Sequence, residues 1–356
     1  MRSLVTLVAM VALAACGGGE TRGAPVSATA TATHPHTASP SATPLINVDQ
    51  MMGGFYNTQQ TLFVAGQDKV SAVTLLNHFT RFEIPTAGQA QVALDPKSVW
   101  LYVLDAPGGK TRLRTFDADG GFERGKRENL ASPAAGGRSL GTAFDGRVLV
   151  MRSDATRSWV DAYSAIELTP LARVAEKSGC GDRLLASAGL IAIVCLADGS
   201  MTLGLPGEPT IASVEAGPVR YVAATLAADG TIYAATAERR LAVLTVGSQK
   251  LAFYDWPGEW AGTVLPDSLA ASTGAIVLAQ QQADVPYARV FMSTNLTQRQ
   301  SHRLSGTPQG GILMLWPLAY FTVGDSVRHI DLSTGLLEVM REGVGANAIP
   351  GAIAAR

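Results

Sequence analysis

The chain has 356 residues, of which 47% are hydrophobic and 16% are charged, and its formal net charge at pH 7 is −1. A charge balance this close to zero does not favour nucleic acid or an anionic membrane surface as a binding partner. The composition suits a secreted globular body.

The first residues of the chain have the layout of a secretory signal. Met1-Arg2 supplies a basic residue, and the apolar stretch from Leu4 to Ala12 is too short to span a bilayer stably. The run Leu-Ala-Ala-Cys that ends at Cys16 resembles the lipobox of bacterial lipoproteins. This resemblance implies a signal peptide at residues 1–15, cleavage before Cys16 and a diacylglyceryl group on its thiol. The alternative is a plain signal peptide in which Cys16 is incidental.

A low-complexity segment follows the cysteine. Up to about Pro44 it consists mainly of Ala, Thr, Ser, Pro and Gly, with Val26 as its one large apolar residue. Such a segment cannot bury enough apolar surface to offset its ordering entropy, so we expect a disordered linker at residues 16–46. Its root-mean-square reach is on the order of 30 Å. We therefore expect an envelope protein, held to a membrane by its N-terminal lipid and facing the extracytoplasmic side.

The remaining residues, 47–356, form a repeating pattern of β-rich runs. Seven short apolar runs recur at intervals of 38 to 47 residues, each with a second strand and turn before it and an outer hairpin after it. The runs are Leu62–Gly66, Trp100–Asp105, Arg147–Met151, Leu190–Val194, Thr231–Ala235, Ala275–Ala279 and Ala319–Val323. A period of about 40 to 50 residues with four strands per unit predicts an all-β, seven-bladed propeller. A six- or eight-bladed ring and a pair of β-sandwiches are the alternatives.

The ends of the repeat region predict how the ring closes. The last repeat completes its outer strand near Met340, yet the chain continues through a further strand-like tail from Ala346 to Ala355. The first repeat, near Leu62, has no inner strand of its own. We therefore predict that the C-terminal strand joins blade one, because an open seam would leave strand edges exposed.

One repeat matches a known propeller type most closely. Leu94–Pro96 followed by Trp100–Asp105 resembles the repeat of seven-bladed propellers of the YVTN and quinoprotein amine dehydrogenase heavy-chain-like type. The resemblance implies the fold. The tryptophan-docking motifs expected of quinone-cofactor dehydrogenases are not evident, and propellers host many unrelated functions.

Cys180 and Cys195 bracket a predicted inner hairpin of the fourth repeat. If they face each other across its strands, the turn is centred between Ser187 and Ala188, next to Gly189. Outside the cytoplasm such a pair is expected to form a disulfide, which contributes roughly 3 kcal/mol by closing a loop of this length. No Cys-x-x-Cys motif indicates redox catalysis.

Three arginines are predicted to begin inner strands that line the central funnel. Arg138, Arg183 and Arg220 occupy these entries in repeats three, four and five, and their offsets from the matched strand positions share parity. Guanidinium groups gathered there would bind a carboxylate or a phosphate. The alternative is that each arginine caps a turn or pairs with a nearby carboxylate such as Asp182.

A second candidate binding surface is the loop that contains Trp256 and Trp260. Pro257 stiffens this loop, so the two indoles would form a rigid aromatic surface for a partner or a sugar. The alternative is that both tryptophans pack between adjacent blades.

The sequence contains no recognised catalytic motif. It has no Gly-x-Ser-x-Gly, no His-x-x-x-His, no phosphate-binding loop and no Cys/His zinc spacing, so we name no catalytic residue, metal or cofactor. The pattern favours a binding or scaffold module for an envelope protein, a glycan or an anionic ligand. A propeller enzyme such as a lactone hydrolase and a non-catalytic subunit of an electron-transfer dehydrogenase are the alternatives.

Overall fold

A computed structural model describes residues 60–130, 137–187, 189–205, 208–214, 219–245, 250–272, 274–292, 295–344, 351 and 353–355. The chain divides into the units Met1–Gly54 and Phe55–Arg356, and all described residues belong to the second. The predicted signal peptide, Cys16 and the predicted linker lie outside the described residues. Among the described residues, no helix has the length and hydrophobicity needed to cross a bilayer.

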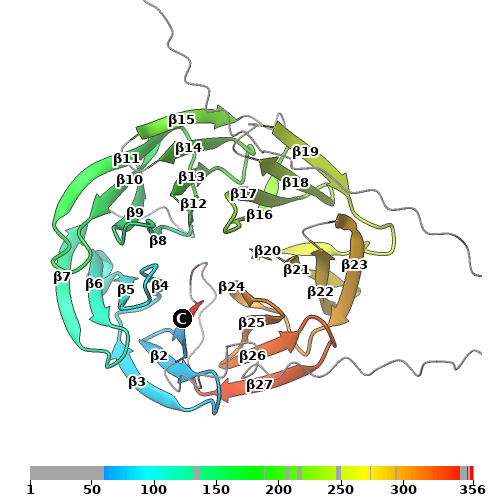
Figure 1. Cartoon of the computed structure of the whole chain (residues 1–356), viewed down its shortest axis with the longest axis horizontal. Helices are drawn as coiled ribbons and strands as arrows, with labels where there is room; N and C mark the ends of the chain where they lie inside the picture. Colours follow the sequence, from blue (N-terminus) through cyan, green and yellow to red (C-terminus); the bar gives the residue numbers. More distant parts are fainter. Residues whose placement is uncertain are drawn as a thin grey trace, which may run out of the picture. The chain divides into compact units, whose positions relative to one another are not determined.

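The described strands form seven four-stranded antiparallel sheets, the blades (Figure 1). From the centre outward, blades one and two contain β28 (Ile353–Ala355), β1 (Thr61–Ala65), β2 (Lys69–Thr74) and β3 (Thr80–Pro85), then β4 (Gln91–Leu94), β5 (Trp100–Asp105), β6 (Thr111–Asp117) and β7 (Glu123–Leu130). Blades three and four contain β8 (Leu140–Thr142), β9 (Val148–Ser153), β10 (Arg157–Tyr163) and β11 (Pro170–Ser178), then β12 (Arg183–Ser187), β13 (Leu190–Val194), β14 (Met201–Leu205) and β15 (Glu208–Val214).

The other three blades repeat this order of strands. Blades five and six contain β16 (Tyr221–Leu226), β17 (Thr231–Thr236), β18 (Arg240–Thr245) and β19 (Lys250–Asp255), then β20 (Thr263–Ala271), β21 (Ala275–Gln282), β22 (Val285–Met292) and β23 (Asn295–Arg303). Blade seven contains β24 (Gln309–Leu315), β25 (Leu318–Val323), β26 (Ser326–Asp331) and β27 (Leu337–Glu342). A 3-10 turn, η1 (Pro107–Gly109), lies between β5 and β6.

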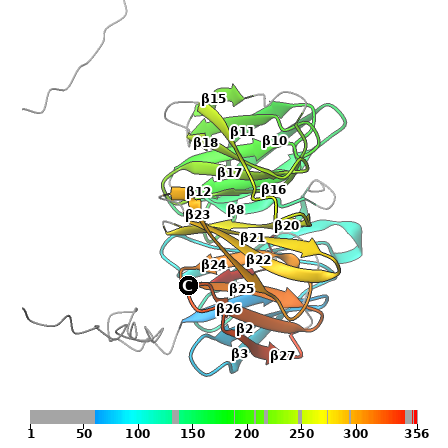
Figure 2. The ribbon, with the colours of Figure 1, turned by 90° about the vertical axis from the view of Figure 1, so that its right-hand side faces the viewer.

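The innermost strands close a ring. Each of β28, β4, β8, β12, β16, β20 and β24 contacts the innermost strand of both neighbouring blades. Figure 2 shows the same blades after a quarter turn. The C-terminal strand β28 pairs antiparallel with β1, with Phe63 opposite Ala354. The predicted seven-bladed, all-β propeller and its closure by the C-terminal strand are therefore confirmed.

The apolar runs that revealed the repeat are the second strands of the blades, β1, β5, β9, β13, β17, β21 and β25. Strands β1 and β13 are buried along their whole length, because other strands flank them and neighbouring blades cover both faces. Six apolar clusters lie between successive blades from blade one to blade seven, and each combines residues from two neighbours. Packing between blades, rather than a single central core, holds the innermost strands in place around the centre.

Candidate functional site

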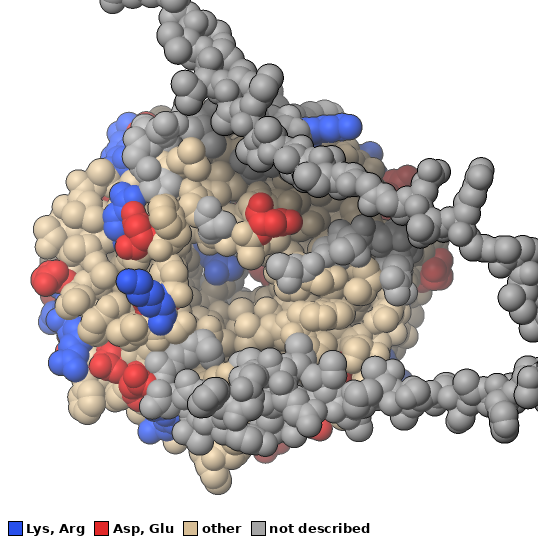
Figure 3. Space-filling view, in the orientation of Figure 1, with Lys and Arg blue, Asp and Glu red and all other residues tan. Residues whose placement is uncertain are grey.

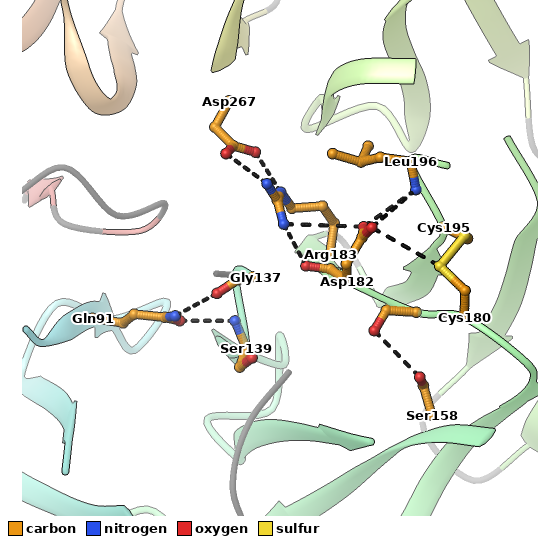
Figure 4. Close-up of polar contacts among 11 residues, drawn as sticks. Gln91, Gly137, Ser139, Ser158, Cys180, Asp182, Arg183, Cys195, Leu196 and Asp267 are labelled. Carbon is orange, nitrogen blue, oxygen red and sulfur yellow. Dashed lines mark hydrogen bonds and ion pairs between the residues drawn. A yellow bond between two sulfur atoms is a disulfide. The ribbon is translucent and has the colours of Figure 1, made fainter. Parts of the chain in front are cut away.

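The innermost strands surround a central opening, and Figure 3 shows a positively charged side chain inside it. Charged residues from three blades come together there: Arg138 precedes β8, Arg183 begins β12 and Asp267 lies within β20. We call these three residues the channel site. Figure 4 shows the arrangement of Arg183 and Asp267 together with Asp182 and Gln91.

An ion pair crosses the channel from blade four to blade six. Arg183 donates from Nη2 to Oδ2 of Asp267 at 2.5 Å and from Nε to Oδ1 of the same carboxylate. The two side chains are 9% and 14% exposed. Burial raises the pKa of Asp267, and the hydrogen bonds from Arg183 oppose this shift. The paired ends are 84 residues apart in sequence, so the bond ties together two blades that are not neighbours.

Asp267 reaches Arg183 because the inner strand of blade six bulges. The register between β20 and β21 shifts between Val264 and Leu269, and Asp267 has a φ of 56°. Aspartate is one of the few residues with a side chain that tolerate this left-handed backbone region. Gly311 on β24 permits the bulge, because a Cβ at that position would lie 3.3 Å from the carbonyl oxygen of Asp267. Such strained positions gather at functional sites.

The backbone around Arg138 is held from blade two by the amide of Gln91, which is 6% exposed. Its Nε2 donates to the carbonyl of Gly137 at 2.6 Å, and its Oε1 accepts from the amides of Ser139 at 2.8 Å and Leu140 at 3.0 Å. These contacts bracket Arg138 on both sides. Gln91 is therefore a positioning residue for Arg138, although it makes no contact through the arginine side chain.

The Arg138 side chain is exposed to the channel and forms no hydrogen bond or ion pair with any described residue. In the sequence just before Arg138, residues 131–136 contain no Asp or Glu. Surrounding protein lowers the pKa of Arg138 by desolvation, Asp267 opposes this and Arg183 adds repulsion. Arginine still carries its charge at neutral pH, so the channel holds a cation that can bind an anion.

The three predicted arginines do not all meet. Arg138 and Arg183 form an isolated parallel β-bridge, and the amide of Leu184 donates to the carbonyl of Arg138 at 2.7 Å. Arg220 lies exposed just before β16, and no contact among the described residues joins it to the other two. Arg183 pairs with Asp267, which sequence reasoning did not identify, as well as with the predicted Asp182 at 4.0 Å. A ligand-binding role for the three arginines stays a prediction.

Trp256 and Trp260 are buried, with exposures of 8% and 3%. Both belong to the apolar cluster between blades five and six, where the Trp260 ring contacts Phe291 edge-on at 5.0 Å between centroids. Neither indole is available as an exposed aromatic surface, which corrects that expectation. The alternative, packing between adjacent blades, describes their position, because burying a large aromatic ring there stabilises the interface.

The predicted disulfide between Cys180 and Cys195 is present, with a Cα–Cα distance of 5.3 Å. The predicted register is wrong by one residue, since Ser187 pairs with Leu190 and the turn is centred one position later. The bond therefore lies beyond the ends of β12 and β13 rather than between facing strand residues. It brackets Asp182, whose carboxylate accepts from the amide of Leu196 at 3.2 Å. Burial raises the pKa of Asp182, and the positive charge of Arg183 opposes the shift.

The sequence matches no protein-family model and no curated protein. Solved structures share the fold. A periplasmic gluconolactonase from Pseudomonas aeruginosa, PpgL, is 14% identical with a TM-score of 0.59, over 83% of this chain and 98% of that one. Hydrazine synthase from Kuenenia stuttgartiensis is 12% identical with a TM-score of 0.58, over 80% and 93%. AztD from Citrobacter koseri is 9% identical with a TM-score of 0.54, over 83% and 98%. At these identities the likeness shows a propeller and nothing about activity.

Proposed function

We propose that this propeller is a binding module whose central channel takes a small anionic ligand, with Arg138 as the contacting cation. One observation carries the proposal. Arg138 is exposed in the channel with no partner among the described residues, while the nearest carboxylate, Asp267, is already bound by Arg183. A guanidinium that has no ion pair with another described residue can form a two-point, charge-assisted contact with a carboxylate.

The charges of the channel favour a ligand with a single negative charge. Asp182 and Asp267 balance Arg138 and Arg183, so the four groups together are neutral. A monocarboxylate gains the Arg138 contact and meets little repulsion, whereas a phosphate dianion brings a second charge toward the two aspartates. We therefore propose a small monocarboxylate as the ligand class.

Replacing Arg138 by Gln will weaken carboxylate binding at least tenfold, since a charge-assisted contact is worth about 1.5–3 kcal/mol. The measurement is calorimetric titration of the full chain with acetate, lactate and a sugar acid, at an ionic strength held constant with chloride. Arg341→Gln is the matched control, because Arg341 is exposed on the outermost strand of blade seven. Equal affinities in both variants, or no saturable binding by the unmodified protein, would contradict the proposal.

We also propose that the body is held at the bacterial envelope through a lipid on Cys16. The lipobox-like run supports this, and the disulfide fits an oxidising compartment. Cys16→Ala will move the protein from the membrane fraction to the soluble fraction and abolish incorporation of a labelled fatty acid. Retention of the label in the variant would place the lipid elsewhere.

A second candidate function is hydrolysis of a lactone, and the observation that favours it is Asp267. Its carboxylate lies in the channel on a strained backbone, and burial raises its pKa above the usual value for an aspartate. Turnover of a simple lactone by the unmodified protein, and its loss on Asp267→Asn, separates this candidate from passive binding. Absence of turnover leaves the binding module.

A further inference from the structure

A second group of charged residues lies between blades two and three, away from the channel site. It consists of Arg127 on β7, Arg152 on β9, and Asp161 and Tyr163 on β10, together with Arg173 on β11. We call these five residues the Tyr163 cluster. Tyr163 is 1% exposed and belongs to the apolar cluster between the same two blades, so packing holds its ring in place beside the charged side chains.

Two guanidinium groups from different blades converge on this ring. The Cζ atoms of Arg127 and Arg152 lie 5.8 and 5.9 Å from the centroid of the Tyr163 ring. Arg152 also donates to the Tyr163 hydroxyl. The two charges repel each other, because the positive charge of Arg127 lowers the pKa of Arg152.

The Tyr163 cluster and the residues paired with it contain fewer carboxylates than cations. Arg152 and Arg173 share Asp161, at 3.4 and 3.6 Å. Arg173 also shares Glu176 with Arg157, at 2.8 and 2.9 Å, and Asp154 lies 3.6 Å from Arg157. With Arg127 this makes four arginines for three carboxylates.

Arg127 is the arginine left over, because it makes no ion pair with any described residue. The segment that follows its strand, residues 131–136, contains no acidic side chain. The buried Nε of Arg152 makes no hydrogen bond, and its contact with Asp161 is an ion pair at 3.4 Å. Burial lowers the pKa of Arg152, Asp161 opposes this, and the charges of Arg127 and Arg173 lower it further.

We propose that Arg127 and Arg152 form a second anion site, which binds a phosphate group between blades two and three. Arg127 offers a complete guanidinium fork and Arg152 its remaining donors, and together these match the several acceptor oxygens of a tetrahedral phosphate better than the two of a carboxylate. The occupant is either free phosphate or the phosphate group of a monoester.

The test is titration of the full chain with inorganic phosphate and, separately, with glycerol phosphate, at an ionic strength held constant with chloride. We expect saturable binding that Arg127→Gln weakens at least tenfold. Arg341→Gln, the exposed control on blade seven, leaves the affinity unchanged. Arg127→Lys retains the charge without the fork and gives an intermediate affinity. Tighter binding of the monoester identifies an esterified ligand, and tighter binding of inorganic phosphate identifies the free ion.

Three outcomes would overturn the proposal. They are no saturable phosphate binding by the unmodified protein, equal affinity in Arg127→Gln and Arg341→Gln, and loss of phosphate binding in Arg138→Gln alone. The last outcome would place the phosphate in the channel; it would support Arg138 as the contacting cation and contradict the monocarboxylate as the ligand class. Thermal unfolding without phosphate checks that Arg127→Gln is folded, which we expect because Arg127 is half-buried and makes no ion pair with a described residue.

Discussion

Replacing Asp267 by Asn will lower the free energy of unfolding by about 3 kcal/mol, because it leaves the Arg183 guanidinium buried without its main counterion. Asparagine keeps the shape of the side chain and tolerates the left-handed backbone at this position, so the change isolates the charge. Asp182 remains 4.0 Å from Arg183 and keeps the loss at the lower end for a buried pair. Denaturant unfolding at pH 7 measures this difference in the free energy of unfolding between the variant and the unmodified protein.

A double-mutant cycle assigns this loss to the ion pair. Arg183→Met alone leaves Asp267 uncompensated, so the double variant will be more stable than the sum of the single losses predicts, by about 2 kcal/mol. Glu83→Gln is the control, because Glu83 pairs with Lys69 at 2.7 Å but is 44% exposed. Glu83→Gln will lower the free energy of unfolding by less than about 1 kcal/mol. Similar small losses in Asp267→Asn and Glu83→Gln, without coupling, would show that the cross-channel pair adds no stability.

The fold could be predicted because each blade carries one strand buried on both faces. Such strands read as continuous apolar runs, for example Trp100–Asp105, and their spacing gives the number of blades directly. The closure of the ring could be predicted by counting strands in each repeat, because the first repeat lacked an inner strand and the C-terminal tail supplied one at Ile353–Ala355. These features are local in sequence, so a single chain displays them.

The channel site could be predicted only in part, because its key contacts are not local. The inner-strand positions of Arg138 and Arg183 follow from the repeat, but Asp267 enters the channel through a bulge that the strand pattern does not reveal. Gln91 was also missed, since its amide holds a segment of the next blade. The parity argument for Arg220 assumed that the turns differ in length by two residues, and the register of the disulfide hairpin shows that an expected turn can be misplaced by one residue.

The buried tryptophans illustrate a different limit. Trp256 and Trp260 lie in a connection between blades, which sequence reasoning treats as exposed. In the structure this connection follows β19 of blade five and precedes β20 of blade six, and both rings fill the interface between them. Whether an aromatic ring in a loop faces solvent or a neighbouring blade depends on the path of the loop, and composition does not encode that path.

Removing the disulfide, by Cys180→Ser combined with Cys195→Ala, will lower the free energy of unfolding by about 3 kcal/mol, as expected for a closed loop of this length. Alanine is chosen for Cys195 because that residue is fully buried and a serine hydroxyl would have no assured partner. For a body of roughly 300 residues this corresponds to a fall of about 5 °C in the midpoint of thermal unfolding. Dithiothreitol will produce the same fall in the unmodified protein and none in the variant.

The disulfide will also affect the cross-channel ion pair, because Arg183 lies within the loop that the disulfide closes. The bond between Cys180 and Cys195 restrains the backbone at Asp182 and Arg183. Arg183 also donates from Nη1 to the carbonyl of Asp182, so the guanidinium that binds Asp267 has little freedom to move. Repeating the cycle between Arg183 and Asp267 without the disulfide will therefore give a coupling energy at most half as large. A lower overall stability with unchanged coupling would mean that the disulfide stabilises blade four but does not position Arg183. A reduced coupling would make the channel site dependent on an oxidising compartment.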